Sequence, residues 1–164
     1  MKTLILIRHA KSSWELTSVE DFDRPLNDRG KHDAPEMAKR LLKKGIKIDA
    51  FISSPAKRAK KTAQLFSKEF RSNKDDIIYL PELYAARVDV FSRVVKSIDN
   101  AYHTIALFSH NPGITEFVNT LTHIHIDNVP TCGVFGVKVL IDSWSDFEEA
   151  KKEYWFFDYP KMKD

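Results

Sequence analysis

The chain has 164 residues, of which 43% are hydrophobic and 12% aromatic, a composition typical of one globular domain spanning residues 1–164. Its net charge of only +3 excludes the strongly basic class of nucleic-acid-binding domains, and no stretch approaches the roughly 20 apolar residues of a membrane helix. The single cysteine, Cys132, allows no internal disulfide, and the short apolar run before Arg8 is unlike a signal peptide. We therefore expect a cytoplasmic protein with neither a membrane nor a nucleic-acid partner. The sequence does not predict the oligomeric state.

Apolar runs and helical stripes alternate along the chain. Continuous apolar runs predict buried strands, and apolar residues spaced three and four apart predict helices. This alternation predicts an α/β fold with a mostly parallel sheet. The predicted strands are 3–7, 48–52, 77–80, 104–108, 133–141 and 154–157, and the apolar stripes of the predicted helices lie within 34–42, 59–70, 91–98 and 114–121.

Local residue types predict where helices begin and end. Ser54-Pro55 and Asn111-Pro112 each join a capping side chain to a proline suited to the first helical position. Pro35 interrupts the first helical pattern, so that helix either begins near Ala34 or bends there, and Gly45 is expected to end it.

The residues that follow the predicted strands carry the candidate chemistry, because ligands of open α/β sheets bind beyond the carboxyl ends of the strands. Two arginines, two histidines and a carboxylate would converge there, beside helix N-termini that favour anions. A phosphate or similar oxyanion is the simplest ligand. These residues are Arg8 and His9, then Arg58 in the turn after Ser53-Ser54-Pro55, then Glu82, then His110 within segment 109–113.

Each of these residues also has a structural interpretation when taken alone. Arg8 could form a surface ion pair, and His110 could cap a helix. Arg58 could belong to a solvated basic helix face with Lys57, Lys60 and Lys61. The shared position at strand ends favours the functional interpretation.

Three segments resemble motifs of the histidine phosphatase superfamily. LIRHAKS resembles its Arg-His signature, SSPAKRAKKTA its arginine-bearing second motif, and SHNPG its second histidine motif. The segments DFDRPLNDRGKHDA and PELYAA narrow the resemblance to SixA-like phosphohistidine phosphatases. The resemblance implies a phosphoglycerate mutase-like, three-layer α/β/α sandwich.

The resemblance also implies residue roles. His9 would be the nucleophile, and Arg8, Arg58 and His110 would bind the phosphoryl oxygens, without a metal or another cofactor. We expect His9 to be neutral and His110 protonated when a ligand is bound. His123 and His125 lack the further ligands of a familiar metal site.

The general acid is less clearly marked. Glu82 is the first candidate, and Asp21 and Asp23 are the alternatives, although Asp23-Arg24 is better explained as an ion pair that holds the loop. The imidazole of a phosphohistidine leaves more easily than an alkoxide, so a site without a strong acid suits a P–N bond.

The leading hypothesis is a metal-independent phosphatase that acts through phospho-His9 on a phosphohistidine-bearing protein. The alternatives are a phosphomonoesterase of the same mechanism that acts on small molecules, and a phosphate-binding module without turnover. Trp14 and segment 131–133 are expected to border the pocket or merely to pack.

Overall fold

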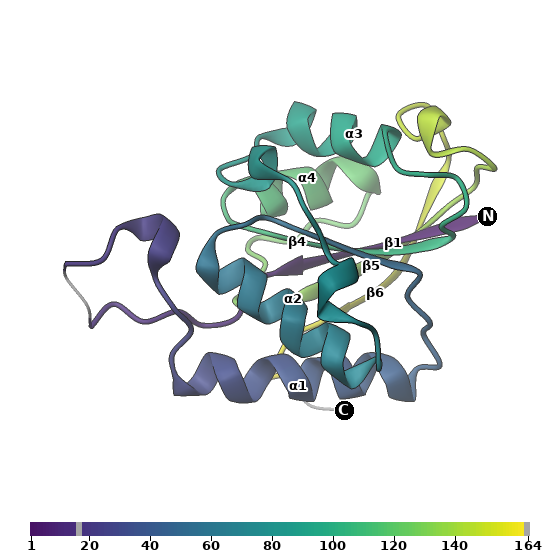
Figure 1. Cartoon of the computed structure of the whole chain (residues 1–164). Coiled ribbons are helices and arrows are strands. Elements are labelled where there is room, and N and C mark those ends of the chain that lie inside the picture. Colours follow the sequence, from purple (N-terminus) through teal and green to yellow (C-terminus); the bar gives the residue numbers. More distant parts are fainter. Residues whose placement is uncertain (16–17, 163–164) are drawn as a thin grey trace.

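The computed structural model describes residues 1–15 and 18–162, which form a six-stranded mixed sheet flanked by α-helices (Figure 1). The strand order is β3-β2-β4-β1-β5-β6, in which β3, β2, β4 and β1 are parallel and β5 is antiparallel to both of its neighbours. The mostly parallel α/β sheet is therefore as predicted. The strands are β1 (Lys2–Arg8), β2 (Ala50–Ser53), β3 (Ile78–Tyr79), β4 (Thr104–Ser109), β5 (Val134–Val139) and β6 (Lys152–Asp158), and the helices are α1 (Asp28–Lys43), α2 (Lys57–Glu69), α3 (Val88–Lys96) and α4 (Gly113–Leu121).

The sheet separates two hydrophobic layers, as Figure 1 shows with α3 and α4 on one face and α1 and α2 on the other. Successive side chains of a strand point to opposite faces, so β1 contributes side chains to both hydrophobic layers. Leu4 and Leu6 are buried in the cluster that contains the aromatic residues of α3 and α4. Ile5 and Ile7 are buried in the cluster formed with α1 and α2. This three-layer arrangement holds β1 in the middle of the fold.

Helix α1 begins earlier than its sequence pattern suggested. The Asn27 side chain caps it by accepting a hydrogen bond from Gly30 N, and Pro35 lies inside the helix. An interior proline costs about 3 kcal/mol, which the burial of the helix's apolar face offsets. The expected start near Ala34 is therefore wrong. Gly45, with φ of 77°, follows the end of the helix as predicted.

The two predicted cap-plus-proline helix starts are also wrong. Ser54 Oγ lies 2.8 Å from His110 Nε2 and accepts from Ala56 N at 3.2 Å, but it does not cap the helix, and α2 begins only at Lys57. The Asn111 side chain accepts from Thr115 and donates toward the segment around Val129, and α4 begins at Gly113 without a side-chain cap. In both places the side chain expected to cap the helix also contacts another segment, Ser54 near His110 and Asn111 near Val129.

The segment between β1 and α1 projects from this edge (Figure 1), and it contains the 3₁₀ turn η1 (Asp21–Asp23). Its two ends are joined by a bridge between Ser12 and Leu26. A second 3₁₀ turn, η3 (Pro81–Leu83), follows β3. Among the helices of residues 1–15 and 18–162, none has both the length and the apolar character of a membrane span.

Candidate active site

The register of β1 and β4 places two histidines side by side. Arg8 and Ser109 are paired at the ends of these parallel strands, so the next residues, His9 and His110, leave the sheet at the same level. The backbone N–H of His9 donates to the carbonyl of Ser109 at 3.1 Å. The two imidazole rings lie with their centroids 5.2 Å apart, and both are buried.

The hydrogen bonds of His9 define its tautomer. Arg58 Nε lies 3.4 Å from His9 Nε2, and a guanidinium can only donate, so Nε2 carries the lone pair. The proton is then on Nδ1, which donates to the carbonyl of Ala10 at 2.7 Å. Burial, aided by the neighbouring cations, lowers the pKa of His9 well below its usual value. The ring is therefore neutral, with a nucleophilic nitrogen held next to a cation.

Thr62 fixes the position of Arg58 relative to His9. Its hydroxyl donates to the carbonyl of Arg58 at 2.7 Å, one turn earlier in α2, and accepts from Ala10 N at 3.0 Å. All three groups are buried. A single hydroxyl thus ties the first turn of α2 to the backbone that follows His9.

Arg8 and His110 each have a buried nitrogen without a partner. His110 Nε2 lies 2.8 Å from Ser54 Oγ, whereas His110 Nδ1 has no hydrogen-bond partner among the described residues. Arg8 Nη1 donates to the carbonyl of Val129 at 3.0 Å, whereas its Nε likewise has no partner in that part of the chain. Burial and the charge of Arg58 lower the pKa of His110 to about 3. Such unsatisfied groups are expensive in a protein interior and are typical of a site that binds a ligand.

Asp21 is the counter-ion of the site. Its carboxylate accepts from Tyr84 Oη at 2.6 Å, Arg58 Nη2 at 3.0 Å and Arg24 Nη2 at 3.1 Å. These donors, Tyr84 first and Arg58 next, lower the pKa of Asp21 to about 2. The ion-pair partner of Arg24 is thus Asp21 and not, as the sequence suggested, its neighbour Asp23, because the 3₁₀ turn brings residues three apart together.

These groups surround a cavity of about 300 Å³ at the carboxyl edge of the sheet. Of the five predicted site residues, Arg8, His9, Arg58 and His110 line it, and Glu82 does not. Glu82 is an exposed residue of η3. The cavity lining contains four arginine or lysine side chains and a single carboxylate, that of Asp21. The complete set is Arg8, His9, Lys11, Ser12, Trp14, Asp21, Arg24, Arg58, His110, Asn111 and Thr131.

The cavity rim contains a stacked pair. The guanidinium of Arg24 lies 3.6 Å from the centre of the exposed Trp14 ring, and Arg24 Nη1 donates to Ser12 Oγ at 2.6 Å. Trp14 and Thr131 therefore border the cavity, as one of the two sequence interpretations had it. His125 lies beside Asp127, and within residues 1–15 and 18–162 no group of three or more His, Cys, Asp or Glu side chains is placed to hold a metal.

Several contributors were missed from the sequence. Tyr84 lies in PELYAA and Thr62 in SSPAKRAKKTA without a predicted role of their own, and Ser54 is predicted to cap a helix. Their position near strand ends and motifs was a visible signal for Tyr84 and Ser54. Thr62 lies within the segment SSPAKRAKKTA, but no local pattern indicates its role, because that role depends on a contact with Ala10 across the fold.

Comparisons with known proteins give a family match over the first part of the chain. Residues 4–84 match the family model described as the histidine phosphatase superfamily, branch 1. An uncharacterised chloroplast protein of Arabidopsis thaliana is 29% identical over 153 residues, which is 88% of this chain and 70% of that protein.

Solved structures share the fold. The crystal structure of a protein described as phosphohistidine phosphatase SixA, from Agrobacterium tumefaciens, has a TM-score of 0.80 and 24% identity, and the match covers 97% of this chain and 99% of that one. A protein histidine phosphatase SixA in complex with tungstate has a TM-score of 0.81 and 20% identity, with 96% and 97% of the two chains covered. The segment 4–84 thus matches the histidine phosphatase superfamily by sequence, and the chain shares the fold of these two SixA structures.

Proposed function

We propose that the protein is a phosphatase that forms a phosphohistidine on His9 and that its substrate is a phosphohistidine-bearing protein. The observation that carries the proposal is the neutral Nε2 of His9 beside Arg58, in a cavity with a large excess of positive charge. The partnerless nitrogens of Arg8 and His110 support an oxyanion as the ligand. Tungstate, which a SixA of similar fold binds, is a tetrahedral oxyanion like phosphate.

In the first step, the lone pair of His9 Nε2 attacks phosphorus, and the bond between phosphorus and the leaving group breaks. Arg8, Arg58 and His110 would bind the equatorial oxygens, on which charge accumulates in the transition state. The phosphoryl group is then on Nε2, while Nδ1 keeps its proton and its bond to Ala10. In the second step, water attacks phosphorus and passes a proton to solvent, while the P–Nε2 bond breaks and its electron pair returns to Nε2. Orthophosphate leaves, and His9 is neutral again.

The carboxylates near the site support a substrate with a good leaving group. Asp21 is ionised at neutral pH, because its pKa is about 2, so it has no proton to give. Glu82 lies outside the cavity lining. An alkoxide needs such a proton, whereas a departing imidazole can be protonated by solvent. This favours a P–N bond over an alkyl phosphate ester.

The decisive experiment compares three substrates: a histidine-phosphorylated protein, p-nitrophenyl phosphate and an alkyl phosphate. We expect the highest kcat/KM on the phosphohistidine protein, and a phosphoryl group trapped on His9 after acid-free quenching and mass analysis. His9→Ala should abolish turnover, and the exposed His123→Ala should not change it.

Three results would contradict the proposal. Activity of His9→Ala close to wild type would remove the nucleophile. A higher kcat/KM on the alkyl phosphate would favour the small-molecule phosphomonoesterase. Binding of orthophosphate without turnover of any substrate would leave a phosphate-binding module.

A further inference from the structure

A second depression adjoins the active-site cavity. It has a volume of about 630 Å³, and we call it the lysine groove. Its lining includes four lysines and a single carboxylate. Its apolar side chains come from the projecting segment and from the residue Pro55, just before α2. The residues that define it here are Lys31, Lys57, Lys60, Lys61, Asp23, Phe22 and Pro55.

The lysine groove and the active-site cavity share their dividing wall. Along η1, Asp21 lines the cavity while Phe22 and Asp23 line the groove. In the first turn of α2, Lys57 lines the groove and Arg58 the cavity. A chain lying in the groove would therefore have its neighbouring residues at the phosphate-binding site.

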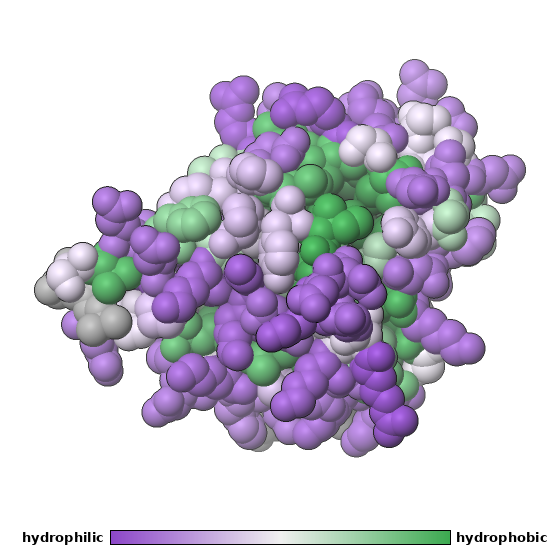
Figure 2. Space-filling model, in the orientation of Figure 1, coloured by the Kyte–Doolittle hydropathy of each residue, from purple (hydrophilic) through white to green (hydrophobic). Residues whose placement is uncertain are grey.

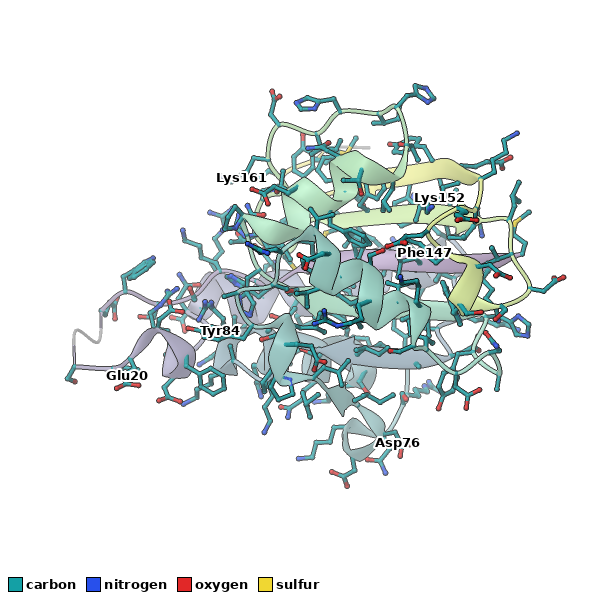
Figure 3. The ribbon with its side chains drawn as sticks, turned by 90° about the horizontal axis from the view of Figure 1, so that it is seen from above. Glu20, Asp76, Tyr84, Phe147, Lys152 and Lys161 are labelled. Carbon is teal, nitrogen blue, oxygen red and sulfur yellow. The ribbon has the colours of Figure 1, made fainter. Side chains whose placement is uncertain are left out.

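Aromatic contacts also connect the two hollows. The Phe22 ring, 37% exposed, packs edge-on against Tyr84 with ring centroids 5.1 Å apart. Tyr84 in turn donates to Asp21 and lies edge-on to His110 at 5.5 Å. Figure 3 shows Tyr84 at the same end of the molecule as Glu20, in the segment that leads into η1. Phe22 is thus an exposed apolar contact one side chain away from the catalytic cavity.

The charge of the lysine groove is not neutralised by its surroundings. Its four lysines are exposed, and none forms an ion pair with another described residue. Figure 2 shows the face over α1 and α2 to be largely hydrophilic, with small hydrophobic areas between. Unpaired like charges around a partly apolar hollow are complementary to an acidic peptide with apolar side chains.

The opposite end of the molecule has the opposite charge. A depression formed mainly by the β5–β6 connection is lined by four carboxylates and one lysine: Asp142, Asp146, Glu148, Glu149 and Lys96. Because β5 is antiparallel to β1, this connection lies at the amino edge of β1, away from the catalytic edge. Figure 3 shows Phe147, which belongs to it, far from Tyr84. The separation of charge would turn the catalytic edge toward an acidic partner as it approaches.

We propose that the lysine groove docks an acidic segment of the phosphoprotein substrate, next to its phosphorylated histidine. This inference rests on the proposed function and adds the chemistry of the substrate surface to it. A nucleic acid fits less well, because Phe22 and Pro55 offer apolar contacts, which suit the side chains of a peptide, where a phosphate backbone would need further cations.

The test uses two synthetic peptides of equal length, each phosphorylated on one central histidine, with flanking glutamates in one and glutamines in the other. We expect the wild type to have about tenfold higher kcat/KM on the glutamate peptide at low ionic strength, and this preference to shrink with added salt. Lys57→Gln/Lys60→Gln/Lys61→Gln should lose the preference through a higher KM, while its kcat/KM on p-nitrophenyl phosphate stays unchanged.

The matched control is Lys43→Gln/Lys47→Gln/Lys68→Gln, which removes the same charge from exposed positions outside the groove. It should keep the preference. Equal kcat/KM on both peptides, or a preference that survives in the groove variant, would overturn the docking proposal alone. Failure to hydrolyse either peptide would overturn the proposed function and the docking with it. A DNA oligonucleotide and an unphosphorylated glutamate peptide are also compared as inhibitors of glutamate-peptide turnover. Stronger inhibition by the oligonucleotide, if it is lost only in the groove variant, would assign the groove to nucleic acid.

Discussion

Arg58 donates a hydrogen bond from Nε to the Nε2 of His9, over 3.4 Å, while its other two nitrogens bond to Asp21. One guanidinium therefore fixes the tautomer of His9, the proposed nucleophile, and carries the charge that a phosphoryl group would meet. The rigid fork of an arginine can do both at once, whereas a lysine has a single nitrogen.

Replacement of Arg58 should separate these two tasks. We expect Arg58→Ala to lower kcat/KM on p-nitrophenyl phosphate by about 100- to 1000-fold, as for the loss of a transition-state donor. Arg58→Lys should recover only a small part, because it restores charge without the fork. The exposed Arg87→Lys serves as the control and should behave as wild type. Near wild-type activity of Arg58→Lys would show that charge alone suffices.

Removal of the Asp21 charge should strengthen the binding of phosphate. Asp21 neutralises part of the charge of Arg58 and Arg24, so Asp21→Asn should lower the inhibition constant of orthophosphate by about three- to tenfold, the size of a partly screened charge interaction. The measurement is competitive inhibition of aryl phosphate turnover at pH 7. A raised inhibition constant would mean that Asp21 acts mainly by holding the arginines in place.

The stability of the protein should fall in mild acid because of His110. Its pKa is about 3 in the fold, while a histidine in the unfolded chain titrates near 6.5. Between these values the unfolded state binds more protons, so the free energy of unfolding decreases as the pH drops below about 6.5 and is fully retained above it. His9, whose pKa is also lowered, contributes in the same direction.

Thermal denaturation between pH 7 and pH 5 checks this prediction. His110→Asn should show a smaller decrease in Tm over this range than the wild type, whereas the exposed His103→Asn should not differ from it. Parallel curves for His110→Asn and wild type would contradict the prediction.

Thr62 should matter for stability more than its size suggests. Thr62→Val keeps the shape of the side chain but leaves Ala10 N and the carbonyl of Arg58 with one hydrogen bond fewer each in a buried place. We expect the free energy of unfolding to decrease by about 1–3 kcal/mol, measured by urea denaturation. Thr120→Val, which loses one bond to a helix carbonyl in a half-buried position, is the control and should lose less than about 1 kcal/mol.

The sequence was most informative where a pattern repeats or a motif is local. The apolar runs predicted all six strands, and the residues after them placed Arg8, His9, Arg58 and His110 at one cavity. Local signals failed where a side chain has two possible partners. Ser54 and Asn111 are good helix caps in isolation, but in the fold Ser54 Oγ lies beside His110, and the Asn111 side chain bonds to Thr115 and Val129.

The loop between β1 and α1 was the hardest part to predict. Asp21, Asp23 and Glu82 are all carboxylates close to strand ends, and only the 3₁₀ turn decides that Asp21 meets Arg58 and Arg24. Two of the partners of Asp21, Arg58 and Tyr84, come from segments more than 30 residues away. No periodicity encodes such contacts.

Because Lys57 and Arg58 are consecutive, substitutions at the two positions should affect different properties of this protein, both in evolution and in the laboratory. The two residues belong to one helical turn but face different hollows, so substitutions of Lys57 can retune partner choice while the reaction centre stays intact. An insertion or deletion in the preceding residues 54–56 would instead rotate both at once. Point mutations can therefore change which partner the groove prefers without moving Arg58, whereas changes in the length of that connection would move both residues.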